Sequence, residues 1–147
     1  MDKILKFLEE DTQKLGVLST VNQENKPESA VVYYTSDKEA NIYFVTRAAS
    51  RKYRNSVINP NACFVISTEF PAKTLQIGGT MDMVTDAHEQ EELFPKLIKI
   101  TTEKNLTPPI SKMDSSEIIF VKLSAKWIRL GDFSNPVGDM IFEEIKK

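Results

Sequence analysis

The stretch YFVTRAASRK, residues 43–52, combines a strand pattern with a cluster of hydroxyl and cationic side chains. Its apolar first half predicts a β-strand, and Ser50 is placed to begin a short helix. A helix N-terminus carries free backbone N–H groups and partial positive charge, so it favours an anion, above all a phosphate. Thr46 and Ser50 add hydroxyl donors there, while Arg51 and Lys52 add full charges. The stretch therefore predicts a strand, a turn and a helix that together form an anion site.

The net charge of the whole chain argues against nucleic acid as the ligand of this cationic stretch. The net charge is −2, whereas nucleic-acid-binding domains usually carry a strong basic excess. We therefore expect no nucleic-acid partner, although a small-barrel binder using Arg47, Arg51, Lys52 and Arg54 would reveal itself by salt-sensitive binding to single strands. A capped surface helix with solvated charges is the remaining interpretation of the same residues.

Short apolar, β-branched segments separated by polar turns follow one another along the chain. Hairpin-like connections between them indicate an antiparallel barrel, and Gly78-Gly79 predicts a bulge or bend that helps a sheet to curl. We predict one mainly β (α+β) domain over residues 1–147. The expected strands are residues 15–21, 29–35, 41–46, 63–68, 74–85 and 118–130, the expected helices are residues 2–14, 51–58 and 87–104, and residues 106–116 form a Pro-rich connection.

The sequence lacks the motifs of several common catalytic sites. One histidine and one cysteine cannot furnish a histidine- or cysteine-rich zinc site, so we expect no metal. No Gly-x-Ser-x-Gly elbow, Walker loop or Rossmann fingerprint is present. Cys63 is interpreted as a buried, inert thiol, and His88 as an exposed residue without function. We name no catalytic residue, and a redox cofactor suits such a chain because the cofactor itself performs the chemistry.

Several short motifs occur in an order and spacing that resemble a known family. They are Leu18-Ser19-Thr20-Val21, Pro27, Tyr43 to Thr46 followed by Ser50-Arg51-Lys52, Asn59-Pro60, and Gly79-Thr80-Met81 with Val84 and Asp86. Over about residues 10–130 the chain resembles the FMN-binding split-barrel family typified by pyridoxamine 5′-phosphate oxidase, which includes the general-stress and nitroimidazole-resistance proteins. The resemblance implies a six- to seven-stranded antiparallel split β-barrel with flanking helices. It also implies a homodimer that binds FMN between its two subunits.

The resemblance further implies which residues contact the cofactor. The phosphate of FMN would fall on the residues that the physical reasoning selected independently, namely Thr46, Ser50, Arg51 and Lys52. The isoalloxazine ring would lie along a strand. The backbone of that strand would form hydrogen bonds with the polar edge of the ring, and its apolar side chains would pack against the faces of the ring. That strand comprises Ser29, Ala30, Val31, Val32 and Tyr33, with Val45 beside Thr46.

Two departures from the oxidase pattern point to another branch of the family. Thr74 falls where the oxidase branch has a flavin-contacting glutamine, and the oxidase's C-terminal arginine and histidine motif is missing. The chain is therefore more similar to the shorter general-stress branch, in which a late aromatic residue approaches the flavin. Trp127 is the candidate for that role, and packing in the core is the alternative, since Trp127 alternates with apolar neighbours on a predicted strand.

These inferences combine into one expected function. We predict a cytoplasmic, homodimeric FMN-binding protein that transfers hydride or electrons from a reduced nicotinamide nucleotide to a small acceptor. No membrane is expected, because no segment approaches the length of a span and residues 1–3 do not resemble a secretory signal. The alternatives are a non-catalytic flavin carrier or sensor, and a split barrel that binds haem or a deazaflavin. Haem would need an axial ligand, for which His88 or a tyrosine is a weak candidate.

Overall fold

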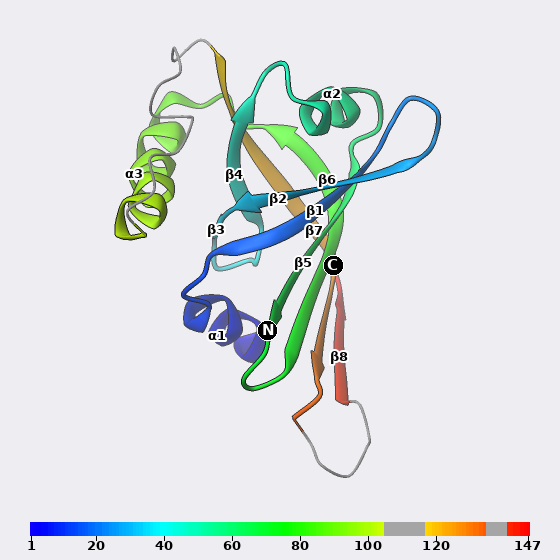
Figure 1. Cartoon of the computed structure of the whole chain (residues 1–147), viewed down its shortest axis with the longest axis vertical. Helices are drawn as coiled ribbons and strands as arrows, with labels where there is room; N and C mark the ends of the chain where they lie inside the picture. The colour runs from blue at the N-terminus through cyan, green and yellow to red at the C-terminus, as the bar shows by residue number, and fades with distance from the viewer. Residues whose placement is uncertain (105–116, 135–140) are drawn as a thin grey trace.

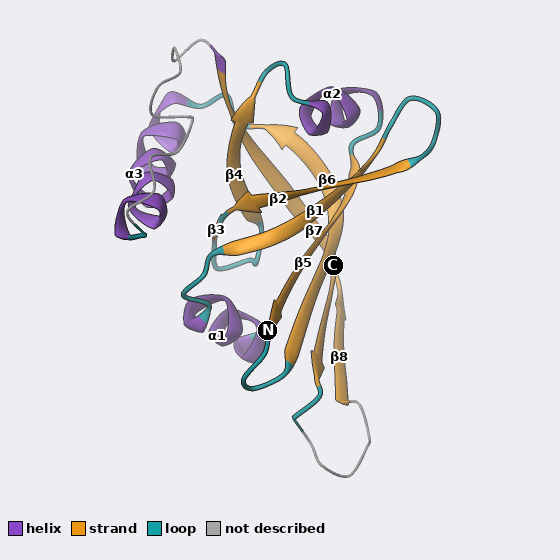
Figure 2. Cartoon of the chain, in the orientation of Figure 1, coloured by secondary structure: helices purple, strands orange, loops and turns teal. Residues whose placement is uncertain are grey.

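The computed structural model describes residues 1–104, 117–134 and 141–147. In these ranges the chain forms a strongly curled antiparallel sheet with helices at its margins, as Figures 1 and 2 show. The predicted mainly β, antiparallel split barrel with flanking helices is thus confirmed, although the sheet has eight strands rather than six or seven in the described residues. The strands are β1 (Leu15–Val21), β2 (Pro27–Tyr33), β3 (Thr35–Ser36), β4 (Ile42–Arg47), β5 (Asn61–Thr68), β6 (Lys73–Met83), β7 (Ile118–Asp132) and β8 (Ile141–Lys146), and the helices are α1 (Asp2–Glu10), α2 (Arg51–Ile58) and α3 (Ala87–Glu103).

The strand order explains why the barrel is split. Hydrogen-bonded neighbours follow the path β2-β1-β5-β6-β7-β4-β3, with β8 added beside β7. The sheet curls until the edge strand β2 contacts β4, although these two fully described strands share no ladder of backbone hydrogen bonds. One edge of β2 therefore has no strand partner among the described residues, and β2 contacts both β4 and α2 (Figure 1).

The core lies inside the curl of the sheet. Fully buried side chains from β1, β4, β5, β6 and β7 meet there, among them Leu18, Phe44, Phe64, Ile77 and Leu123. Helix α1 closes one end of this core with apolar side chains at positions 4, 7 and 8. A smaller cluster attaches α3 to the outside of β4 through Leu93 and Leu97, which pack against Tyr43 and Val84.

Gly78 and Gly79 produce the predicted bulge. The pairing of β6 with β7 shifts register between these two residues. A Cβ atom on Gly79 would lie 1.9 Å from the backbone oxygen of Ser124, and one on Gly78 would lie 2.1 Å from the ring of Trp127. Both glycines are therefore required by close packing, and the Trp127 ring covers the backbone of Gly78.

A few boundaries differ from the sequence-based expectation. The first helix was expected to reach residue 14 but ends at Glu10, because Asp11 is extended and accepts a 2.7 Å hydrogen bond from the Tyr34 hydroxyl. The short strands β3 and β8 were not expected. The Pro-rich connection at 106–116 lies outside the described residues. None of the helices in the described ranges is long and apolar enough to span a membrane.

Candidate functional site

The turn after β4 begins α2 with a network of two hydroxyl groups. Ser50 is the N-cap of α2, and its Oγ accepts a 3.3 Å hydrogen bond from the backbone N–H of Tyr53. The buried hydroxyl of Thr46 donates to the same Oγ at 2.9 Å. Because Ser50 Oγ accepts two hydrogen bonds, its own hydrogen remains available for a further acceptor. The two hydroxyls therefore fix the helix start and leave one donor for a ligand.

Several donors at this helix start have no acceptor among the residues that the structure describes. The backbone N–H groups of Arg51 and Lys52 form no hydrogen bond there, as is usual in the first turn of a helix. The Lys52 side chain is half-buried and forms no ion pair with a described carboxylate. Burial lowers the pKa of Lys52 because it disfavours the charged form. The site thus offers a partly desolvated cation and open N–H groups to an anion.

Arg51 is arranged differently from its neighbour. Its Nη2 lies 2.7 Å from Oε2 of Glu28, which belongs to β2. The other oxygen of Glu28 accepts a 3.2 Å hydrogen bond from Asn55 Nδ2, which also donates to the Thr20 hydroxyl at 3.0 Å. These contacts border a surface hollow of about 670 Å³ between α2 and the loop after β1, lined also by Arg54. Of the two predicted cations, only Lys52 lacks a described counter-ion.

Strand β2 presents its residues to both faces of the sheet and its backbone to a free edge. Ala30 and Val32 point inward, and Val32 is 7% exposed, whereas Ser29, Val31 and Tyr33 point outward, and Val31 is 61% exposed. Since β2 ends the hydrogen-bonded path, about half of its N–H and C=O groups face away from β1. This strand therefore offers a row of backbone donors and acceptors close to β4.

Val45 and Thr46 occupy opposite faces of β4. Thr46 turns toward α2, whereas the half-buried Val45 packs against the cluster beneath α3. The two residues therefore lie next to each other at the end of β4 but contact different elements.

Thr74 and Trp127 are not brought to this site within one chain. Thr46 pairs with Ile119 on β7, and Trp127 follows eight residues later, roughly 25 Å further along the strand at about 3.3 Å per residue. Thr74 lies on β6 toward the end of the sheet away from the bulge, where its hydroxyl donates to the Ile66 carbonyl. A contact of either residue with a ligand held at Ser50 would have to come from a second copy of the chain.

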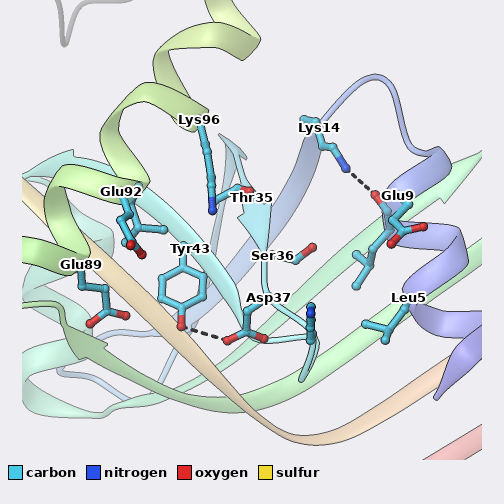
Figure 3. A pocket seen from close by; sticks show the side chains of 13 residues that line it. Leu5, Glu9, Lys14, Thr35, Ser36, Asp37, Tyr43, Glu89, Glu92 and Lys96 are labelled. Atoms are coloured by element: carbon cyan, nitrogen blue, oxygen red, sulfur yellow. Dashed lines mark hydrogen bonds between the residues drawn. The ribbon is translucent and has the colours of Figure 1, made fainter.

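A separate pocket of about 480 Å³ opens between α1, the β3–β4 turn and α3 (Figure 3). Tyr43 donates a 3.0 Å hydrogen bond to Asp37, which also accepts two hydrogen bonds from Asn41. Burial and the bond to Asp37 raise the pKa of Tyr43. None of the predicted site residues lines this pocket, and no sequence motif indicates it because its walls come from three separate elements.

Comparisons with known proteins agree with this fold. Residues 1–130 match the protein family described as pyridoxamine 5′-phosphate oxidase. The chain belongs to this family. No curated protein matches the chain.

Solved structures show the same fold at low sequence identity. The general stress protein 26 from Bacillus anthracis superposes with a TM-score of 0.72 at 17% identity, covering 99% of this chain and 97% of that one. A pyridoxamine 5′-phosphate oxidase-related, FMN-binding protein from Nostoc punctiforme gives a TM-score of 0.63 at 11% identity, with coverages of 99% and 95%. A heme-binding protein from Mycobacterium smegmatis gives 0.67 at 14% identity, with coverages of 92% and 57%.

Proposed function

We propose that this family member binds FMN and transfers hydride or electrons from a reduced nicotinamide nucleotide to a small acceptor. The observation that carries the proposal is the open helix start at Ser50, where the half-buried Lys52 has no described counter-ion. A phosphate monoester fits this donor set, since it carries close to two negative charges and three acceptor oxygens. Lys52, Ser50 and the first N–H groups of α2 would hold the phosphate, with Thr46 orienting Ser50.

The free edge of β2 supports the flavin part of the proposal. The isoalloxazine ring has a polar pyrimidine edge and apolar faces, and residues 29–33 supply backbone groups along a free edge with Val31 and Tyr33 beside it. When bound, FMN supplies hydride and single-electron chemistry. The chain itself then needs only to bind and orient the flavin and to shield it from water, and we assign no catalytic acid or base to it.

The outer face of the sheet supports the proposed homodimer. Val17 and Val31 are 40% and 61% exposed, and Phe70 at the tip of the β5–β6 hairpin is 88% exposed. They border a groove of about 540 Å³, and exposed apolar patches commonly mark interfaces. A second copy on this face would bury these side chains. Val31→Glu is expected to shift sedimentation from dimer to monomer, whereas an unchanged dimer would argue against this face.

Parallel titrations with FMN and riboflavin test the phosphate assignment. Both ligands share the ring, so we expect FMN to bind at least tenfold more tightly, because it alone presents a phosphate to α2. Replacing Arg51 and Lys52 together with Ala should abolish this difference while the circular dichroism spectrum stays unchanged. Equal affinities for FMN and riboflavin in the unaltered protein would contradict the assignment.

Anaerobic mixing of the FMN-loaded protein with NADH or NADPH tests the oxidoreductase part. Rapid bleaching of the flavin is the expected result. Persistent colour with both donors would favour the alternative of a flavin carrier or sensor.

Haem is the second candidate ligand, since one structural neighbour is described as heme-binding. The only histidine, His88, is exposed at the start of α3 with Nε2 3.9 Å from Glu92, and it faces no described cavity. A haem site would therefore need another axial ligand. A Soret band in the purified protein would favour this candidate over FMN.

A further inference from the structure

Glu28 connects the two elements of the proposed FMN site. It belongs to β2, which is proposed to hold the flavin ring, and its carboxylate contacts α2, which is proposed to bind the phosphate. One oxygen lies 2.7 Å from Arg51 Nη2, and the other accepts from Asn55 at 3.2 Å. Asn55 is itself buried and anchored by its hydrogen bond to Thr20. Both oxygens of Glu28 therefore have partners, and its side chain is only 24% exposed.

This arrangement changes the charge that an incoming anion meets. Arg51 and Lys52 contribute two positive charges, and Glu28 offsets one of them. Arg51 has five N–H donors, so a phosphate must either share its guanidinium with Glu28 or displace the carboxylate. In both cases the anion comes close to a carboxylate that repels it.

We infer that Glu28 determines the specificity of the site for phosphorylated ligands, because it competes with the phosphate for Arg51 and so weakens the binding of FMN relative to riboflavin. This inference rests on the proposed FMN site. It assigns Glu28 a positioning role through Arg51 rather than a direct contact with the ligand.

Glu28→Gln separates charge from shape. The amide oxygen can still accept from Asn55, but the negative charge is lost. Exposed ion pairs change an equilibrium by about 1.4- to fivefold, and a phosphate carries close to two charges, which doubles the interaction free energy, so FMN affinity should rise by about two- to thirtyfold. Riboflavin affinity should stay unchanged. The salt dependence of FMN binding should steepen, since the freed Arg51 adds one cation to the phosphate contacts.

Two control variants distinguish this role from a structural one. Glu24→Gln removes a carboxylate from the same hairpin, but Glu24 pairs with Lys26 at 2.9 Å and not with α2, so FMN affinity should not change. Glu28→Asp keeps the charge and should retain the ratio of FMN to riboflavin affinity found in the unaltered protein. Thermal melting of each variant checks that the fold is intact.

Inorganic phosphate provides a probe that does not depend on the flavin. The inference predicts that Glu28→Gln binds phosphate about two- to thirtyfold more tightly than the unaltered protein, measured by calorimetry. If FMN binds to neither protein but phosphate shows this increase, the proposed cofactor is wrong and the role of Glu28 stands. If Glu28→Gln is folded and binds phosphate and FMN no more tightly than the unaltered protein, the inference is overturned.

Discussion

Lys52→Met removes the cation that carries the proposed phosphate site and keeps most of its apolar stem. Lys52 is half-buried without a described counter-ion, so a phosphate would be its main electrostatic partner. A hydrogen bond to a charged group contributes about 1.5–3 kcal/mol, which corresponds to a loss of about ten- to 150-fold in FMN affinity. Arg51→Met should cost only about threefold, because Glu28 already engages that guanidinium.

Lys52→Met should weaken FMN binding, but it should not lower the stability of the ligand-free protein. Burial lowers the pKa of Lys52 in the folded state below its ordinary value of 10.5. The unfolded chain therefore binds more protons than the folded chain between the lowered pKa and 10.5, and the stability of the unaltered protein rises with pH across that window. Lys52→Met has no buried charge at this position, so it should be at least as stable as the unaltered protein at neutral pH. Its stability should not rise with pH across that window.

Quenching of flavin fluorescence measures affinity, and urea unfolding at pH 7 and near pH 10 measures stability. Lys96→Met is the matched control, because Lys96 is an exposed lysine on α3 outside the proposed site. An FMN affinity of Lys52→Met within twofold of the unaltered protein would refute the reasoning. A clear loss of stability at neutral pH would also refute it.

Three further predictions concern the scaffold around the site. Gly79→Ala places a Cβ 1.9 Å from the Ser124 carbonyl oxygen, so it should destabilise the fold by about 3 kcal/mol, and an unchanged melting temperature would contradict the close approach. Tyr34→Phe leaves the buried Asp11 carboxylate without its 2.7 Å donor and should cost about 1–3 kcal/mol in urea unfolding. Burial raises the pKa of Asp37, but hydrogen bonds from neighbouring groups outweigh it and hold the pKa below its ordinary value. The stability advantage of the unaltered protein over Asp37→Asn should therefore be full above about pH 5 and should vanish as pH falls through that lowered pKa, and a constant difference down to pH 2 would contradict it.

The strand, turn and helix at 43–52 could be predicted because the decisive signals are local. Ser50 caps the helix through its own side chain. The bulge could be predicted from the double glycine at 78–79, where the structure leaves no room for a Cβ atom. The end of the first helix could not be predicted in this way. No glycine or proline stands at residues 11–14 to end the helix. It ends because Asp11 is extended and accepts a hydrogen bond from the Tyr34 hydroxyl, which is far along the chain.

The sequence also could not predict that Arg51 pairs with Glu28 while Lys52 has no described counter-ion. Successive residues on a helix point about 100° apart, so neighbours in sequence do not share a target. Arg51 faces Glu28, which lies 23 residues earlier and reaches α2 only because β2 folds back beside it. The strand β8 was missed for a related reason, since its pairing with β7 depends on contacts distant in sequence.

The absorption spectrum of the purified protein, with the released chromophore identified by mass, tests the central claim most directly. The account predicts the spectrum of oxidised flavin and the release of FMN on denaturation. A colourless protein that also fails to take up added FMN, or a protein with a Soret band and no flavin, would contradict it.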